Sequence, residues 1–229
     1  MTRQATSSTT GQLVLYGDFT CPWSYLASRR VDALVAAGLR VDWRAVRAPA
    51  HDARTGTDRF PVVRRELDLV AAGLRADEGL PYALAGFVPE TAAAAVTGYA
   101  EAYAAGAAEL VRHLLFDAFW AHGCDVGDAQ VVHTLVVDAI RSGWPPGHPR
   151  ADWGYAVVGD DPVAPAPRHL VARWTREWRA TGLDALPVLV LDDEAPLSGA
   201  AAVARLADEL LRRTADRRWS RTPALPHAG

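Results

Sequence analysis

The chain has 229 residues, a formal net charge of −3 at pH 7, and hydrophobic residues at 50% of its positions. That length suits one domain, or a domain with a large insertion, and is ample for a hydrophobic core. Charged residues make up 22% of the chain with nearly balanced signs, which excludes a disordered protein. The slightly negative charge excludes a nucleic-acid partner, and no apolar run reaches the roughly 18 to 20 residues of a membrane-spanning helix.

The first twelve residues are polar and rich in Ser and Thr, and they lack the apolar centre of a signal peptide. We therefore expect a flexible tail there and a cytoplasmic location for the protein. In a reducing compartment, a structural disulfide between the distant Cys21 and Cys124 is not expected.

The next part of the chain predicts a strand, a helix and a second strand. The apolar run Leu13–Tyr16 is typical of a buried strand, and the alternation of apolar and polar residues over Val41–Val46 indicates another. Between them, apolar residues recur at helical spacing up to Ala37, with Pro22 in the first turn and Gly38 as a stop signal. This order predicts a βαβ unit with a right-handed crossover.

Helical patterns dominate the middle of the chain, after a predicted loop over residues 49–57. Asp128 has the position of an N-cap at the start of the last predicted helix. The four helices are expected near residues 60–75, 90–105, 107–122 and 128–142. Six prolines and three glycines between Trp144 and Pro167 then predict a long irregular connection.

The last part predicts a helix over residues 168–181, a β-hairpin and a final helix. The hairpin joins Val188–Leu191 to Ala195–Leu197 through an acidic turn, and the final helix runs from Ala201 to Arg213. Strand-rich ends around a helical middle predict the α/β class and a thioredoxin-like fold with an inserted all-helical subdomain. We expect the two parts of the thioredoxin-like domain at 13–58 and 168–213, the insert at 59–143, and flexible tails at 1–12 and 217–229.

The clearest chemistry lies in Cys21-Pro22-Trp23-Ser24, at the junction of the first strand and the first helix. A thiol there faces free N–H groups and the positive end of the helix dipole, so we expect the pKa of Cys21 to fall below its usual value of about 8.5. Ser24 can hydrogen-bond the thiolate, and Trp23 would form a wall of the substrate cleft. The motif has no second Cys and therefore cannot form a disulfide of its own in a two-thiol redox cycle. The alternative to a reactive Cys21 is an inert, buried cysteine.

Other candidate groups have weaker patterns. Cys124 precedes a helix of the insert and is either a resolving thiol for Cys21 or an unpaired thiol. The spacing of the histidines in the insert fits no metal template, so we predict no metal site. A proline that enters a strand, as in Leu186-Pro187, gives up a ladder hydrogen bond and needs a positional reason.

The segment Asp18-Phe19-Thr20-Cys21-Pro22-Trp23-Ser24-Tyr25-Leu26-Ala27 resembles the start of the DsbA-like thioredoxin-fold family. Within that family it is most similar to the FrnE-type proteins and to the 2-hydroxychromene-2-carboxylate isomerases with their kappa-class glutathione transferase relatives. The resemblance extends from Leu13 to Arg213. Its further matches, in family order, are Trp43-Arg44, Leu80-Pro81-Tyr82, Asp125-Val126-Gly127-Asp128, Leu186-Pro187-Val188 and Leu197-Ser198-Gly199-Ala200.

The resemblance implies that the Leu186-Pro187 peptide bond is cis, lies against Cys21, and is preceded by backbone that pairs with an extended peptide or a thiol ligand. It implies Cys21 and Ser24 as the catalytic residues. The residues that it implies for binding substrate or a small thiol are Pro22, Trp23, Leu186, Pro187, Ser198 and Gly199.

The chain also departs from the family pattern. FrnE-type proteins carry a second Cys where this chain has Ser24, and the isomerase and kappa branches usually carry Ser where it has Cys21. The glutathione-using relatives tend to place an acidic residue just after the glycine that matches Gly199, whereas this chain has Ala200. That difference weakens the case for glutathione through this contact.

Three functional hypotheses follow. The first is a DsbA-like thiol–disulfide oxidoreductase in which Cys21 attacks a disulfide and another thiol resolves the mixed disulfide. The second is an isomerase or transferase in which the helix activates the thiol of a small cofactor and Cys21 or Ser24 only orients it. The third is a non-catalytic binding or scaffold protein, because fold alone does not establish function.

These hypotheses share their expected partners. We expect no tightly bound cofactor, and a low-molecular-weight thiol of the glutathione or mycothiol type as the cosubstrate. The partner would be a small-molecule thiol or disulfide, with no nucleic acid and no membrane. Whether the protein forms a homodimer stays open.

Overall fold

The computed structural model describes residues 13–47, 60–80, 82, 88–153, 164–192 and 194–220. Three sequence predictions lie outside these residues: the tail over 1–12, the loop over 49–57 and the end of the C-terminal tail, residues 221–229.

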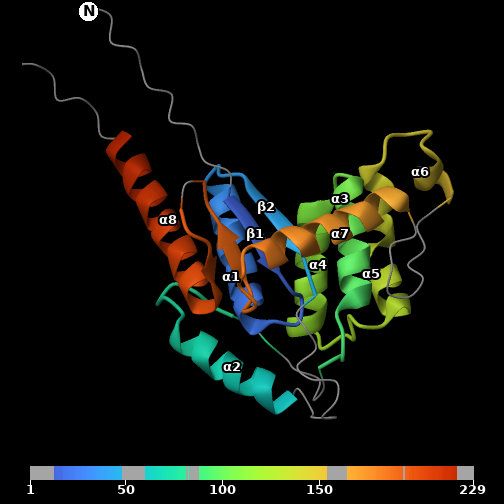
Figure 1. The fold of residues 1–229 in the computed structure, drawn as a ribbon. Coiled ribbons are helices and arrows are strands. Elements are labelled where there is room, and N and C mark those ends of the chain that lie inside the picture. The colour runs from blue at the N-terminus through green and yellow to red at the C-terminus, as the bar shows by residue number, and fades with distance from the viewer. Residues whose placement is uncertain are drawn as a thin grey trace, which may run out of the picture.

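Four strands form one sheet, in the order β2-β1-β3-β4 (Figure 1). β1 (Leu13–Gly17) pairs in parallel with β2 (Val41–Ala45), and the two are joined by the helix α1 (Pro22–Ala36). β3 (Val188–Val190) runs antiparallel to both β1 and β4 (Leu197–Ser198). The predicted thioredoxin-like sheet is confirmed, although β4 begins two residues later than expected.

The ends of α1 follow the sequence signals. Pro22 opens the helix, where its missing N–H has no partner to lose. After Ala36 the chain turns through Gly38, whose φ of 85° is one that glycine adopts without strain. The Leu39 N–H then donates to the Leu34 carbonyl at 3.0 Å, which satisfies a carbonyl of the last turn.

The helical middle is confirmed as four helices: α2 (Phe60–Ala72), α3 (Ala93–Ala104), α4 (Ala108–Trp120) and α5 (Ala129–Gly143). α3 lies at its centre, and residues 93–102 are all buried. Its alanines and glycine allow neighbouring helices to come close. The predicted cap of α5 is also present, since the Asp128 side chain accepts from the N–H groups of Gln130 and Val131.

The C-terminal part of the chain is more helical than expected. A short helix, α6 (Pro149–Trp153), lies in the connection that was predicted to be irregular, and α7 spans Pro165–Ala180. α8 spans Gly199–Ser220, so the prediction of a tail from residue 217 is wrong for residues 217–220. The reason is that no Gly or Pro interrupts the chain between Gly199 and Pro223.

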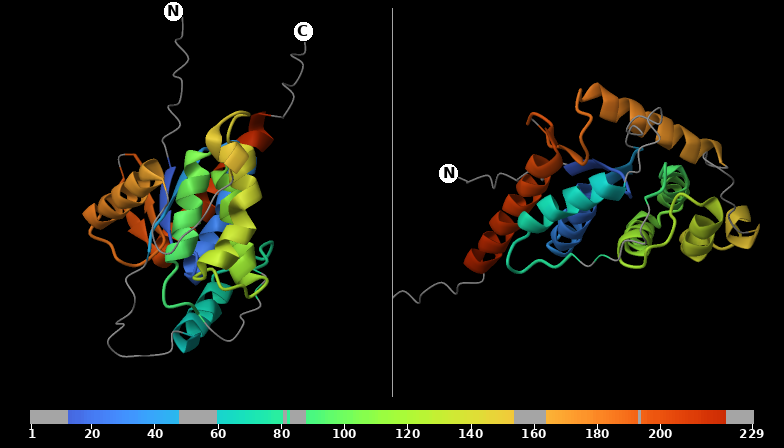
Figure 2. Two further views of the ribbon diagram at one scale, coloured as in Figure 1. Left: turned by 90° about the vertical axis from the view of Figure 1, so that its right-hand side faces the viewer. Right: turned by 90° about the horizontal axis from the view of Figure 1, so that it is seen from below.

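The helices cover both faces of the sheet. α7 crosses one face, while α1 and α8 pack together on the other (Figures 1 and 2). Buried Arg30 of α1 ties these elements together, because it donates to the Val203 carbonyl of α8 at 2.8 Å and forms an ion pair with Glu78. No helix in the described part of the chain is long and apolar enough to cross a membrane.

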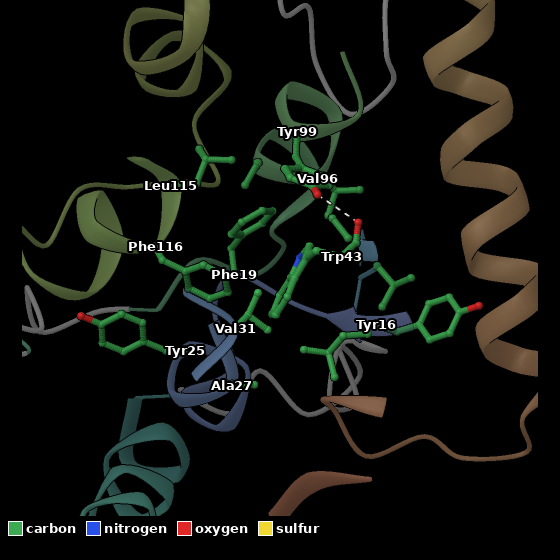
Figure 3. Close-up of a cluster of buried hydrophobic side chains, with 14 of the residues drawn as sticks. Tyr16, Phe19, Tyr25, Ala27, Val31, Trp43, Val96, Tyr99, Leu115 and Phe116 are labelled. Carbon is green, nitrogen blue, oxygen red and sulfur yellow. Dashed lines mark hydrogen bonds between the residues drawn. The ribbon is translucent and has the colours of Figure 1, made fainter. Parts of the chain in front are cut away.

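A cluster of aromatic side chains joins the sheet to the helical middle (Figure 3). The edge of Trp43 meets the ring of Phe116 with centroids 5.5 Å apart, and Phe19 packs on Phe116 at 4.9 Å. Tyr99 donates a hydrogen bond of 2.9 Å to the Trp43 carbonyl. A single hydrophobic core therefore includes both regions, and the predicted boundary between them stays a prediction.

The contact between Trp43 and Gly17 predicts a strong effect of Gly17→Ala. An added Cβ would lie 2.3 Å from a ring carbon of Trp43, so the buried ring would have to move. We expect the free energy of unfolding in urea to fall by about 1 to 3 kcal/mol. The matched control is Gly79→Ala, which meets no atom within 4 Å and should change stability by less than about 0.5 kcal/mol. Equal effects of the two substitutions would contradict this packing.

Candidate active site

Cys21 lies at the N-cap position of α1, directly after the turn that follows β1. Its thiol donates a hydrogen bond of 3.5 Å to the carbonyl of Leu186, a residue far away in the sequence. The following peptide bond, Leu186–Pro187, is cis, the geometry that the resemblance implied. Cys21, Leu186 and Pro187 therefore lie together at the carboxyl end of β1.

Ser24 is fully buried on the first turn of α1, below the thiol. Its Oγ accepts a hydrogen bond of 3.3 Å from the backbone N–H of Asp18. Hydrogen bonds from the hydroxyl and the backbone N–H of Ser24 favour a thiolate on Cys21 and lower its pKa. Ser24 is thus held in a position to stabilise negative charge on Cys21.

The turn before Cys21 is organised by Asp18, which the sequence reasoning did not single out. Its buried carboxylate accepts two hydrogen bonds of 2.7 Å, from the Thr20 N–H and the Thr20 hydroxyl. The Asp18 carbonyl accepts from the Cys21 N–H at 3.2 Å. The sequence signal for this turn was an Asp two residues before a Thr, a pattern typical of an Asx turn.

The expectation of a depressed pKa for Cys21 is wrong. Burial raises the pKa of the Cys21 thiol to about 12, because the surrounding protein removes the water that would solvate a thiolate. The two hydrogen bonds from Ser24 lower the pKa, but they do not compensate for the lost hydration. Asp18 and Glu66 add negative charge and raise the pKa further. At neutral pH the group is therefore a thiol.

The other predicted binding residues mostly surround this point. The Gly199 N–H, at the start of α8, donates to the Pro187 carbonyl at 2.8 Å, and Ser198 pairs with Val188 in the sheet. Trp23 is half-buried, and an added Cβ on Gly73 at the end of α2 would lie 3.8 Å from its ring. Its role as the wall of a cleft stays a prediction.

Cys124 lies in the connection between α4 and α5, and its N–H donates to the Ala118 carbonyl at 2.8 Å. Cys21 and Cys124 are both free cysteines, with no disulfide between them. Whether Cys124 resolves a mixed disulfide on Cys21 stays open.

Three potential metal ligands, Asp32, Glu109 and His113, come within 4.8 Å of one another. Buried Arg112 already donates to both carboxylates, at 2.6 Å to Asp32 and 2.8 Å to Glu109. Its guanidinium supplies the positive charge that a metal ion would bring, so this cluster is a structural ion-pair network.

Comparisons with known proteins agree on the type of fold. The sequence model of the DSBA-like thioredoxin domain matches residues 12–211. No curated protein matches the chain in sequence.

Several solved structures resemble this one over most of both chains. A 2-hydroxychromene-2-carboxylate isomerase is 18% identical with a TM-score of 0.62, over 92% of this chain and 100% of its own. A probable DsbA oxidoreductase from Streptomyces coelicolor is 22% identical with a TM-score of 0.62, over 95% and 94%. The cytosolic disulfide reductase DsbM from Pseudomonas aeruginosa is 17% identical with a TM-score of 0.56, over 91% and 99%.

The raised pKa of Cys21 predicts how its alkylation depends on pH. In a Cys124→Ser variant, where Cys21 is the sole thiol, the rate with iodoacetamide should rise about tenfold per pH unit through the alkaline range without reaching a plateau. The reason is that the thiolate fraction keeps increasing up to a pKa of about 12. Ser24→Ala removes a stabilising hydrogen bond and should slow the reaction at every pH. A plateau that begins below pH 8 would contradict this description of the site.

Proposed function

This chain belongs to the DSBA-like thioredoxin domain family, and we propose that it is a cytoplasmic thiol–disulfide oxidoreductase that works through the single thiol of Cys21. The observation that carries the proposal is the thiol of Cys21 at the start of α1, against the carbonyl before Pro187, with Ser24 in place of a second sulfur. Members of this family are thiol oxidoreductases or isomerases, which supports an enzyme.

The raised pKa gives the proposed reaction its direction. A thiolate with a high pKa is a strong nucleophile once formed, but it is a poor leaving group. Cys21 should therefore attack a disulfide and displace a thiol of lower pKa, and it should keep the mixed disulfide until a second thiol arrives. This property favours the reduction of disulfides over their formation.

The proposed cycle has two exchange steps. First, the Cys21 thiol loses its proton to solvent and its sulfur attacks a disulfide R–S–S–R′, which forms Cys21–S–S–R and releases R′–S⁻ to take up a proton. Second, a small thiol G–SH attacks the sulfur of R, forms G–S–S–R, and returns the Cys21 thiol with a proton from solvent. The sum of the two steps is R–S–S–R′ + G–SH → R′–SH + G–S–S–R, with Cys21 regenerated. A second G–SH then attacks the G sulfur of G–S–S–R, releases R–SH and forms G–S–S–G, so both electrons for the reduction come from two molecules of the small thiol.

A small thiol as cosubstrate has support from the comparisons. The DsbM structure with glutathione is 16% identical to this chain with a TM-score of 0.51, over 90% of this chain and 99% of its own. In this chain, the backbone at Leu186 and the start of α8 at Gly199 would hold such a thiol beside Cys21. The thiol would be of the glutathione or the mycothiol type. Ala200 stands where glutathione-using relatives tend to carry an acidic residue, so glutathione would lack that one contact.

A second candidate function has one observation in its favour. At neutral pH Cys21 is protonated and donates a hydrogen bond, so its S–H could orient the sulfur of a bound small thiol. Cys21 would then act as a hydrogen-bond donor in an isomerase or transferase, the activity named for the similar 2-hydroxychromene-2-carboxylate isomerase.

Substitution of each cysteine separates these possibilities. Cys21→Ser should reduce the glutathione-dependent reduction of a small mixed disulfide to the uncatalysed rate, because a hydroxyl cannot form a mixed disulfide. Cys124→Ser is the matched control and should leave the rate nearly unchanged. If both variants lose activity equally, the two cysteines form a redox pair and the single-thiol mechanism is wrong. An activity that survives in Cys21→Ser would favour the isomerase or transferase.

Restoring the second sulfur of the motif gives an independent prediction. In Ser24→Cys the new thiol occupies the first turn of α1 beside Cys21, so the purified protein should form an internal disulfide under mild oxidation. With a dithiol reductant, the turnover rate of this variant should then exceed that of the wild type. The measurement is the number of free thiols before and after oxidation, with Ser28→Cys, buried one turn further along α1, as the control. A Ser24→Cys protein that keeps all its thiols free would contradict the proposed geometry.

A further inference from the structure

A cleft of about 440 Å³ lies between α7 and Arg47, a residue just after the end of β2. Among the described residues, its lining contains four arginines and no acidic residue. The lining residues are Arg47, Arg168, Val171, Ala172, Thr175, Arg176 and Arg179. A volume of this size is within the range of small-molecule sites in proteins.

The arginines of α7 are arranged by the helical repeat. Arg168, Ala172, Thr175 and Arg179 follow one another at intervals of three or four residues, and Arg176 stands beside Thr175. They therefore share one face of the helix, where the small Ala172 leaves room between the longer side chains. Arg47 adds a guanidinium from the other side of the cleft.

Three of these arginines have no partner among the described residues. In the parts of the chain that the structure describes, no ion pair or hydrogen bond involves the side chains of Arg47, Arg176 or Arg179, and all three residues are exposed. The acidic residue of α7, Glu177, instead forms ion pairs with Arg44 and Arg173 outside the cleft. Like charges three residues apart on a helix reduce its stability. In a chain with a net charge of −3, this concentration of positive charge is local.

We propose that this cleft binds a small molecule that carries two or more phosphate groups. Guanidinium groups donate paired hydrogen bonds to phosphate oxygens, and each phosphate offers enough acceptors for more than one arginine. The Thr175 hydroxyl can donate a further hydrogen bond from the same helix face. At least three unpaired positive charges in one cleft fit an anion of charge near −3 better than a dicarboxylate.

The phosphate site is separate from the thiol site. The Val46 N–H donates to the Gly17 carbonyl at 2.9 Å. Arg47, the next residue, is therefore at the same end of the sheet as the turn that leads to Cys21. α7, however, covers the face of the sheet opposite to α1, the helix that begins after Cys21 (Figures 1 and 2). The inference therefore does not rest on the proposed thiol chemistry.

Calorimetric titration of the full chain with inorganic pyrophosphate at low ionic strength tests this site. We expect saturable binding at one site, weakened about tenfold by Arg176→Gln and by Arg179→Gln, since each removes one charge-assisted contact. Arg64→Gln removes one exposed arginine from α2 and should leave the affinity unchanged. Cys21→Ala should bind pyrophosphate like the wild type, even if the proposed thiol chemistry proves wrong.

Four results would overturn the inference: no saturable binding of pyrophosphate, equal weakening by Arg64→Gln, loss of binding in Cys21→Ala, or succinate binding as tightly as pyrophosphate.

Thermal unfolding of the same variants shows whether a loss of binding comes from the site or from a folding defect. Arg179→Gln should keep or raise the melting temperature without ligand, because it removes repulsion within the cluster. It should also reduce the rise in melting temperature that pyrophosphate produces in the wild type. A rise as large as that of the wild type would contradict the role of Arg179.

Discussion

The ring of Trp43 packs between Gly17 of the sheet and Phe116 of the helical middle, and so joins the two regions of this protein. The ring of Trp43 fills the space in which any larger residue at position 17 would place its Cβ, 2.3 Å away. On its other sides the ring meets Phe116 of α4 and the buried guanidinium of Arg112, 5.7 Å from the ring centroid. The turn that carries Cys21 starts at Gly17, so its position depends on how the helical middle packs against the sheet. A further hydrogen bond supports this arrangement, from the Trp120 indole N–H to the Phe19 carbonyl at 3.0 Å.

Burial also decides the chemistry of the site. It removes water from the sulfur of Cys21 and raises its pKa, whereas the position at a helix N-terminus would lower it. Ser24 limits the effect, since its buried hydroxyl is held by the Asp18 N–H and can serve the thiolate. The outcome is a thiol that ionises reluctantly and leaves reluctantly, which suits a step in which it attacks a disulfide and waits for a second thiol.

Much of this fold could be predicted from local patterns. The βαβ unit, the four helices of the middle, the cap at Asp128 and the hairpin of β3 and β4 all depend on residues close together in the sequence. The C-terminal extent of α8 was underestimated because a polar, charged segment without Gly or Pro resembles a tail as much as a solvated helix. The buried pairs Arg30–Glu78 and Arg112–Asp32 could not be predicted, since each joins residues from distant segments.

In the candidate site, too, the features that depend on contacts between distant segments could not be predicted from local sequence patterns. Sequence reasoning located Cys21 and Ser24, and the resemblance to a family placed Pro187 beside them. It missed the direction of the Cys21 pKa shift because burial of the sulfur and the negative charge of Glu66 of α2 depend on the tertiary structure. Mass spectrometry of the intact protein after incubation with glutathione disulfide tests the central claim most directly. The single-thiol account predicts one glutathionyl group, located on Cys21. An internal disulfide between Cys21 and Cys124, or an adduct on Cys124 with Cys21 left unmodified, would contradict it.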